Sequence, residues 1–368
     1  MKTVKVVFAV VVLGLMIAFQ SCQKDDPETQ VNDENILPTG FMVEIPSALQ
    51  GENSKLLYSK DSKTDTLQGG EIYGHLRAFV HVGYTGAKIV NELITNINEY
   101  HINKPMSFTY TSKVDHRQKQ LDVVEKEEFE GKIYEFKLTI RDLKSSSSEN
   151  IGLELFWNRD PVVGVAIFNP HELNYNETEN PNLRFRIDYD ESPATLYEKT
   201  MIVSISGFEI DDPLTHPYDM STLKMFVGKK GNIVSIYGNS EHPYAKFFTQ
   251  ETGFDWAFVA AGNLTKDIGV AEVGLPSNLL DSQEREVLLV ENSINNVFTN
   301  QIYEVYPSID STTLATYLQN AKAPGFFADG HFVQAETAPS MEYAELLQII
   351  PGLTPYNPLK IHELKIGF

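Results

Sequence analysis

The chain has 368 residues and a formal net charge of −20, with 50 Asp and Glu residues against 30 Lys and Arg. A surface of this charge is unsuited to nucleic acids, because their phosphates are bound by basic patches, so no nucleic-acid partner is expected. The single cysteine excludes an internal disulfide, and the fold must therefore be held together by its core.

The first 21 residues have the pattern of a signal peptide. Lys2 and Lys5 precede an apolar run that covers residues 6–19. A helix needs about twenty apolar residues to span a bilayer, whereas a shorter run behind a basic start is typical of a secretory signal that is removed. We therefore expect residues 1–21 to be cleaved from the mature protein.

The only cysteine follows this segment directly. The stretch "FQSC" (19–22) resembles the lipobox of bacterial lipoproteins, in the looser form used by Bacteroidetes-type bacteria. The resemblance implies that Cys22 carries the lipid, with palmitate as one of its acyl chains. Lys24, Asp25 and Asp26 resemble the export signal of Bacteroidetes surface lipoproteins. Together the resemblances cover about 26 residues and imply a lipid anchor in the outer membrane, with the protein facing the cell exterior.

Residues 22–40 are predicted to be a lipidated, disordered tether. They are polar and acidic, contain Pro27 and Pro38, and have too few apolar side chains to offset the entropy of ordering. A flexible chain of this length has a root-mean-square reach of roughly 20–25 Å, which would hold a folded body away from the membrane surface.

Residues 41–270 are predicted to be β-rich, with one helix at about 86–100. Apolar and polar residues alternate in several segments, for example 183–190 and 200–208, which is typical of antiparallel strands with one solvated face. Within 85–102 the apolar residues instead recur every three or four positions, which indicates an amphipathic helix.

Residues 271–368 are predicted to contain more helix, either as a second region or as part of the same structural unit. Asp281, followed by Glu284, indicates a capping box for a helix that runs to about Tyr303, and shorter helices are expected at 311–320 and 340–350. The alternation in 360–368 predicts a terminal strand. The expected fold class is thus α+β, with a curved or barrel-like antiparallel sheet packed on an amphipathic helix.

Two groups of residues are candidates for ligand binding. Four aromatic or imidazole side chains lie between turn residues in "PGFFADGHF" (324–332), and aromatic residues in loops are often exposed and functional. They are Phe326, Phe327, His331 and Phe332. Asp211, Asp212 and Asp219 form the acidic cluster best suited to calcium, which prefers several oxygen ligands, although the EF-hand spacing is absent. No other cofactor is indicated.

The sequence contains no complete catalytic motif. Neither "HELNY" (171–175) nor "HELKI" (362–366) has the second histidine of a zinc protease, and no G-x-S-x-G is present. The leading hypothesis is a non-catalytic binding or scaffold protein for a glycan, a lipid or a partner protein at the cell surface. The alternatives are a secreted hydrolase whose site is assembled from distant residues, and a structural subunit of an envelope complex.

Overall fold

The structure is a computed structural model that describes residues 36–51, 68–98, 102–145, 150–175, 180–193, 196–210 and 214–368. The chain forms two compact units. The first contains residues up to 42, residues 86–192 and residues 366–368, and the second contains residues 43–85 and 193–365. Neither unit begins or ends near residue 270, where the sequence predicts a boundary.

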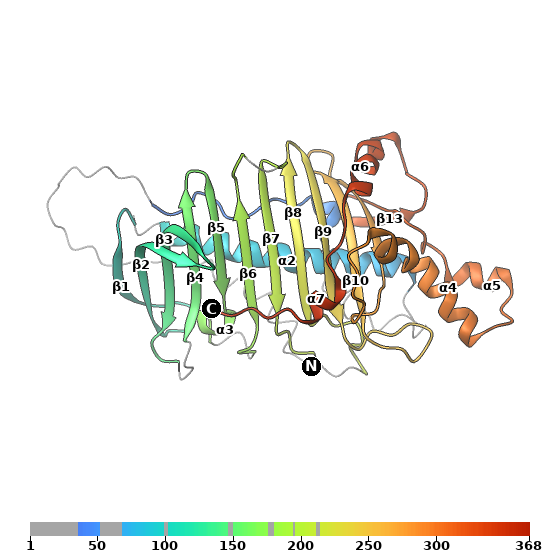
Figure 1. Ribbon diagram of the computed structural model, residues 1–368, viewed down its shortest axis with the longest axis horizontal. Helices are drawn as coiled ribbons and strands as arrows, with labels where there is room; N and C mark the ends of the chain where they lie inside the picture. The colour runs from blue at the N-terminus through green and yellow to red at the C-terminus, as the bar shows by residue number, and fades with distance from the viewer. Residues whose placement is uncertain are drawn as a thin grey trace. The chain divides into compact units, whose positions relative to one another are not determined.

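The first unit is an antiparallel meander in which each strand pairs with the next along the chain (Figure 1). Its elements are β1 (Met106–Thr111), β2 (Gln118–Phe129), β3 (Lys132–Asp142), β4 (Ile151–Arg159), β5 (Val162–Phe168), the short helix α3 (Pro170–Leu173) and β6 (Arg184–Asp190). Inward-facing residues of β4, among them Trp157, are fully buried. The indole of Trp157 donates a hydrogen bond to the carbonyl of Ile36 (2.8 Å), which fixes the first described residues against the sheet.

The second unit contains a second antiparallel meander followed by short helices. Its strands are β7 (Lys199–Ser206), β8 (Thr222–Lys230), β9 (Ile233–His242), β10 (Phe254–Asn263), β11 (Ile268–Gly274), β12 (Gly325–Ala328) and β13 (His331–Ala335). The second unit also contains the first part of the long helix α2 (Gly69–Asn98). Its other helical elements are η1 (Ser47–Leu49), η2 (Glu286–Glu291), α4 (Ile294–Val305), α5 (Ser311–Tyr317), η3 (Met341–Tyr343), α6 (Ala344–Ile349), η4 (Ile350–Gly352) and α7 (Pro358–His362). Apolar residues of β10 and β11 pack against η2 and α6 in one buried cluster.

The predicted amphipathic helix is present but begins much earlier than expected. Helix α2 runs from Gly69 to Asn98 and contributes residues to both units. Its glycines lower helix propensity, which hid the first half of the helix from sequence analysis. They are needed for close packing, because a Cβ atom on Gly83 would lie 2.7 Å from Met225, and one on Gly86 would lie 2.7 Å from Phe185.

The helix predicted from Asp281 to about Tyr303 is wrong in its first part. Residues 281–284 are not helical; the π-helix η2 follows, and α4 begins only at Ile294 with Ser293 as its N-cap. The Asp281 carboxylate accepts a hydrogen bond from Asn357 (2.6 Å) instead of capping a helix. The Asp281 side chain is therefore engaged in a tertiary contact and does not cap a helix.

The terminal strand predicted for residues 360–368 is also wrong. Asn357 caps helix α7, and Pro358 occupies its first turn, where the missing N–H of proline costs nothing. After His362 the chain is irregular. The alternation itself is real, since Leu364, Ile366 and Phe368 are half-buried while Lys365 and Gly367 are exposed.

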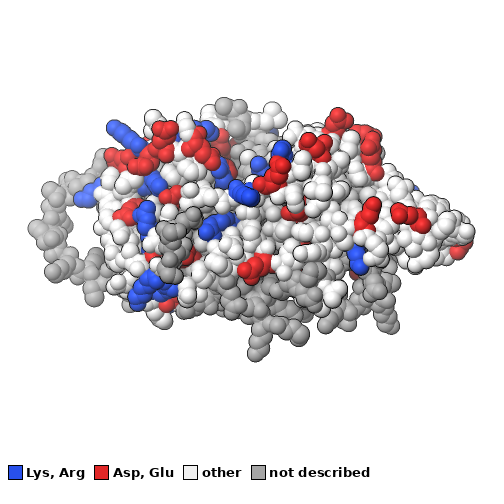
Figure 2. Space-filling model, turned by 60° about the horizontal axis from the view of Figure 1, so that its bottom comes forward, with Lys and Arg blue, Asp and Glu red and all other residues white. Residues whose placement is uncertain are grey.

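The predicted fold class is confirmed: the protein is α+β, rich in antiparallel strands, with a packed amphipathic helix and a group of helices near the C-terminal end. In the part of the chain that the structure describes, β1 pairs only with β2, and β13 only with β12, so neither meander closes on itself. On the face drawn in Figure 2, the coloured Lys and Arg side chains are intermingled with Asp and Glu, and the basic ones form no continuous patch.

Candidate functional site

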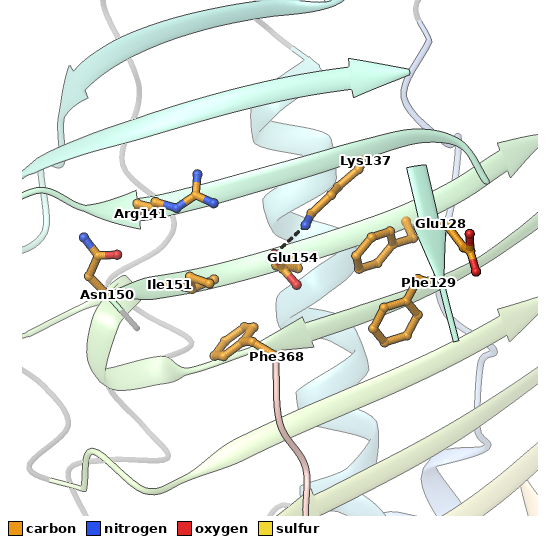
Figure 3. Close-up of a pocket in the computed structure, with 9 residues that line it drawn as sticks. Glu128, Phe129, Lys137, Arg141, Asn150, Ile151, Glu154 and Phe368 are labelled. Carbon is orange, nitrogen blue, oxygen red and sulfur yellow. Dashed lines mark ion pairs between the residues drawn. The ribbon is translucent and has the colours of Figure 1, made fainter. Parts of the chain in front are cut away.

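The candidate site is a groove in the first unit, on the face of the sheet turned away from α2 (Figure 3). It is an open hollow with a volume of about 520 Å³. Its lining residues come from three neighbouring strands, from the approach to β4 and from the end of the chain: Glu128, Phe129, Lys137, Arg141, Asn150, Ile151, Glu154, Phe156 and Phe368.

Two stacked phenylalanine rings, Phe129 and Phe156, belong to the apolar lining of the groove, together with Ile151 and Phe368. Phe156 belongs to β4, between the inward-facing residues Leu155 and Trp157, and therefore points to the opposite face. Phe129, at the end of β2, stacks on Phe156 with ring centroids 4.4 Å apart and an interplanar angle of 18°. Lys126 has φ of +59°, a left-handed conformation that is uncommon for a residue with a side chain. Figure 3 shows that the segment that carries Glu128 and Phe129 lies over the face of the sheet.

The tip of the β2–β3 hairpin is held by an ion pair. Arg186 on β6 donates two hydrogen bonds to the Glu130 carboxylate, at 2.6 and 2.8 Å. This guanidinium also lies over the ring of Phe129, with 5.7 Å between its carbon and the ring centroid. The hydrogen bond from Arg186 lowers the pKa of Glu130 below its ordinary value, because it stabilises the ionised carboxylate. The planar, two-point geometry fixes the hairpin tip, and with it the position of Phe129.

The groove carries two positive and two negative side chains. Lys137 forms an ion pair with Glu154 (2.7 Å), and its ammonium lies 4.8 Å from the centroid of the Phe156 ring. Arg141 pairs with Asp122 at 3.1 Å, while Glu128 is exposed at the rim. The charges of these four side chains therefore cancel, although the chain as a whole is strongly acidic.

This arrangement is suited to a polar ligand with a flat apolar face. Sugar rings stack on aromatic faces, and their hydroxyl groups accept hydrogen bonds from guanidinium and amide N–H groups and donate hydrogen bonds to carboxylates. The half-buried ring of Phe129, supported from behind by the buried Phe156, supplies the first kind of contact, and Arg141, Asn150 and Glu128 supply the second. Ligand sites in proteins commonly combine an apolar wall with a few placed polar groups in this way.

Several of the site residues predicted from the sequence lie outside the described residues. These are the anchor residue Cys22, the export-signal residues Lys24, Asp25 and Asp26, and two of the calcium candidates, Asp211 and Asp212. Asp219 is described and is half-buried in the second unit. Within the described ranges, no three His, Cys, Asp or Glu side chains are arranged to hold a metal ion.

The aromatic loop predicted at residues 324–332 is a β-hairpin. Phe326 and Phe327 are buried in β12. Neighbouring residues of a strand point to opposite faces, so both faces of β12 are covered here. Phe332, on β13, stacks on Tyr73 of α2 with ring centroids 5.2 Å apart. His331 is exposed. The loop assignment was therefore wrong, and two of the four side chains are enclosed in the core.

A serine and a histidine lie within hydrogen-bonding distance in the second unit, as a hydrolase would require. Ser240 Oγ is 2.9 Å from His242 Nε2, and His242 Nδ1 is 3.0 Å from the carbonyl oxygen of Tyr218. Both side chains are fully buried, and the imidazole packs against the rings of Phe79 and Trp256. A substrate carbonyl has no room beside this serine, so the pair carries no hydrolytic proposal.

Two carboxylic acids also face each other in the second unit. Glu241 on β9 lies directly opposite Asp255 on β10 in the strand register. Burial raises the pKa of Asp255 well above its usual value, and the nearby Glu241 acts in the same direction. Glu241 is hydrogen-bonded by His362 Nδ1 (2.6 Å) and Ser221 Oγ (2.7 Å). Both acids are buried, so this cluster is a polar element of the core.

Comparison with protein-family models, with curated proteins and with solved structures finds no match. Among the described residues, no helix combines the length and the apolar character needed to cross a membrane. The assignment of function therefore depends on the groove and on the predicted N-terminal segment.

Proposed function

We propose that the protein is a lipid-anchored, outer-membrane binding protein that faces the cell exterior and takes up an oligosaccharide in the groove of its first unit. The observation that carries the proposal is the half-buried ring of Phe129, which is stacked on the buried ring of Phe156 and lies between charged and amide groups. The anchor rests on the sequence around Cys22. Such a protein holds glycans near the cell without needing a catalytic motif.

A screen of the purified protein by thermal unfolding tests the proposal. At a hundred times its dissociation constant, a ligand adds about 2.7 kcal/mol to the free energy of unfolding. We expect neutral oligosaccharides to raise the midpoint by a few degrees, and lipids, calcium or a chelator to have no comparable effect. A flat response to every oligosaccharide would contradict the proposal, and a shift with lipids alone would replace it.

The second candidate function is hydrolysis of the bound glycan, because Glu128 and Glu154 both line the groove. Glycosidases use two carboxyl groups, one of them as a general acid. Here the Glu154 carboxylate is engaged by the Lys137 ammonium at 2.7 Å, whereas a general acid has to reach the leaving-group oxygen. We therefore expect no shortening of the oligosaccharide after prolonged incubation; product that appears with the wild type and disappears with Glu154→Gln would establish the hydrolase.

A further inference from the structure

The last residues of the chain lie against the same surface as the groove. Ile366 and Phe368 pack on a buried cluster that contains Tyr134, Phe156 and Val165. Phe368 also lines the groove, next to Glu154 in Figure 3, and the guanidinium carbon of Arg184 lies 5.5 Å from the centroid of its ring. All these residues belong to the first unit. The aromatic side chain of Phe368 therefore forms part of the wall of the groove and lies against the cluster that contains Phe156.

This segment is attached by side chains rather than by a strand ladder. Residues 366–368 belong to no helix or strand, and no backbone–backbone hydrogen bond joins them to another described residue. Ile366 and Phe368 are only half-buried, and Gly367 between them is exposed. A contact made by two half-buried side chains is much easier to break than a paired strand, because no backbone hydrogen bonds have to be exchanged with water.

We propose that residues 366–368 are an intramolecular ligand of the groove, which an external ligand must displace in order to bind. This inference rests on the proposed function, since it concerns the regulation of the same site. The segment keeps the cluster around Phe156 covered when no ligand is present, and its removal extends the groove to that cluster.

The size of the effect follows from effective concentration. A tethered segment acts at a concentration on the order of 1 mM. If the same segment binds with a dissociation constant of about 0.1 mM when it is not tethered, the covered state exceeds the open state roughly tenfold. The apparent affinity for an external ligand is then reduced by about the same factor.

The test uses a fluorescein-labelled peptide with the sequence of residues 362–368, HELKIGF, and measures its anisotropy with three forms of the protein. They are the wild type, the double variant Ile366→Ala/Phe368→Ala and the control Gly367→Ala, whose added methyl group meets no atom within 4 Å. We expect the double variant to bind the peptide about tenfold more tightly than the other two. Equal binding by all three forms, or no binding to the double variant, would overturn the proposal. Phe368→Ala alone, compared in the same way, serves as a second variant if the double variant does not fold.

A parallel titration with the strongest oligosaccharide from the thermal screen separates the two proposals. If the groove is covered by the segment, the double variant binds the oligosaccharide about tenfold more tightly than the wild type. Weaker binding would mean that Phe368 is a wall of the site rather than its cover; the inference then fails while the proposed function stands. If the peptide binds as expected but neither form binds an oligosaccharide, the inference that residues 366–368 cover the groove is supported and the proposed function is wrong.

Discussion

Replacing Lys119 by methionine is expected to lower the free energy of unfolding of the first unit by about 3–5 kcal/mol. The side chain of Lys119 is 1% exposed, and its ammonium donates hydrogen bonds to Asp115 (2.8 Å), to Asp142 (2.8 Å) and to the carbonyl of Glu172 (2.7 Å). Burial acts to raise the pKa of Asp115, but the hydrogen bond and charge of Lys119 prevail and lower it. Methionine fills the space but leaves the buried carboxylate of Asp115 without its cation, and Asp142 keeps only its ion pair with Arg117 (2.7 Å).

Urea unfolding followed by tryptophan fluorescence checks this result. Trp157 lies in the first unit and Trp256 in the second, so a Trp256→Phe background reports on the first unit alone. Lys88→Met is the matched control, because Lys88 forms an exposed pair with Glu92 at 3.7 Å, and such pairs contribute at most about 1 kcal/mol. A midpoint for Lys119→Met equal to that of the control would refute the role assigned to the buried cluster.

Acidification below pH 6.5 is expected to destabilise the second unit strongly. Burial lowers the pKa of His75 to about 4 and, together with the nearby His75, the pKa of His242 to about 3. Below about pH 6.5 both imidazoles take up protons in the unfolded chain, whereas in the folded protein they stay neutral. The free energy of unfolding therefore decreases as the pH is lowered. At pH 5 the two residues together remove about 4 kcal/mol.

One buried acid works in the opposite direction. The raised pKa of Asp255 keeps its carboxyl group protonated in the folded state at pH values where the unfolded chain has lost the proton, so lowering the pH favours folding through this group. Between pH 6.5 and 5, the destabilisation by the two histidines exceeds the stabilisation by Asp255, so the free energy of unfolding of the second unit decreases. Urea midpoints at pH 7 and pH 5 should therefore differ, and His75→Phe should remove about half of the histidine contribution. His331→Gln, at an exposed position, is the control; an unchanged pH dependence for His75→Phe would contradict the account.

The parts of the fold that the sequence predicts are those in which local pattern and tertiary packing agree. Ile89, Val90 and Leu93 are buried as the helical period requires, and the alternating segment 183–190 contains β6. The pattern fails where a tertiary contact takes over a local signal. Asp281 binds Asn357 instead of capping a helix, and the alternating segment after His362 finds no strand to pair with.

The groove was not predicted, although two signals for it are present in the sequence. Phe156 is an aromatic residue on the face of β4 opposite Leu155 and Trp157, and Phe129 is an isolated aromatic residue in the charged stretch "EKEEFEGK" (125–132). Their meeting depends on the bend at Lys126 and on the pairing of Arg186 with Glu130, which are separated by 56 positions in the sequence. A contact between residues so far apart cannot be predicted from one amino-acid sequence alone.

The central claim is that the aromatic surface of the groove binds an oligosaccharide. It is tested most directly by calorimetric titration of the strongest oligosaccharide from the thermal screen into the wild type, Phe129→Ala and Tyr303→Ala. Tyr303 is an exposed aromatic residue on α4, in the other unit, and is the matched control. A lost stacking contact of about 1.4 kcal/mol corresponds to a tenfold weaker dissociation constant. The account predicts this loss for Phe129→Ala and an unchanged constant for Tyr303→Ala; equal constants for the wild type and Phe129→Ala would contradict it.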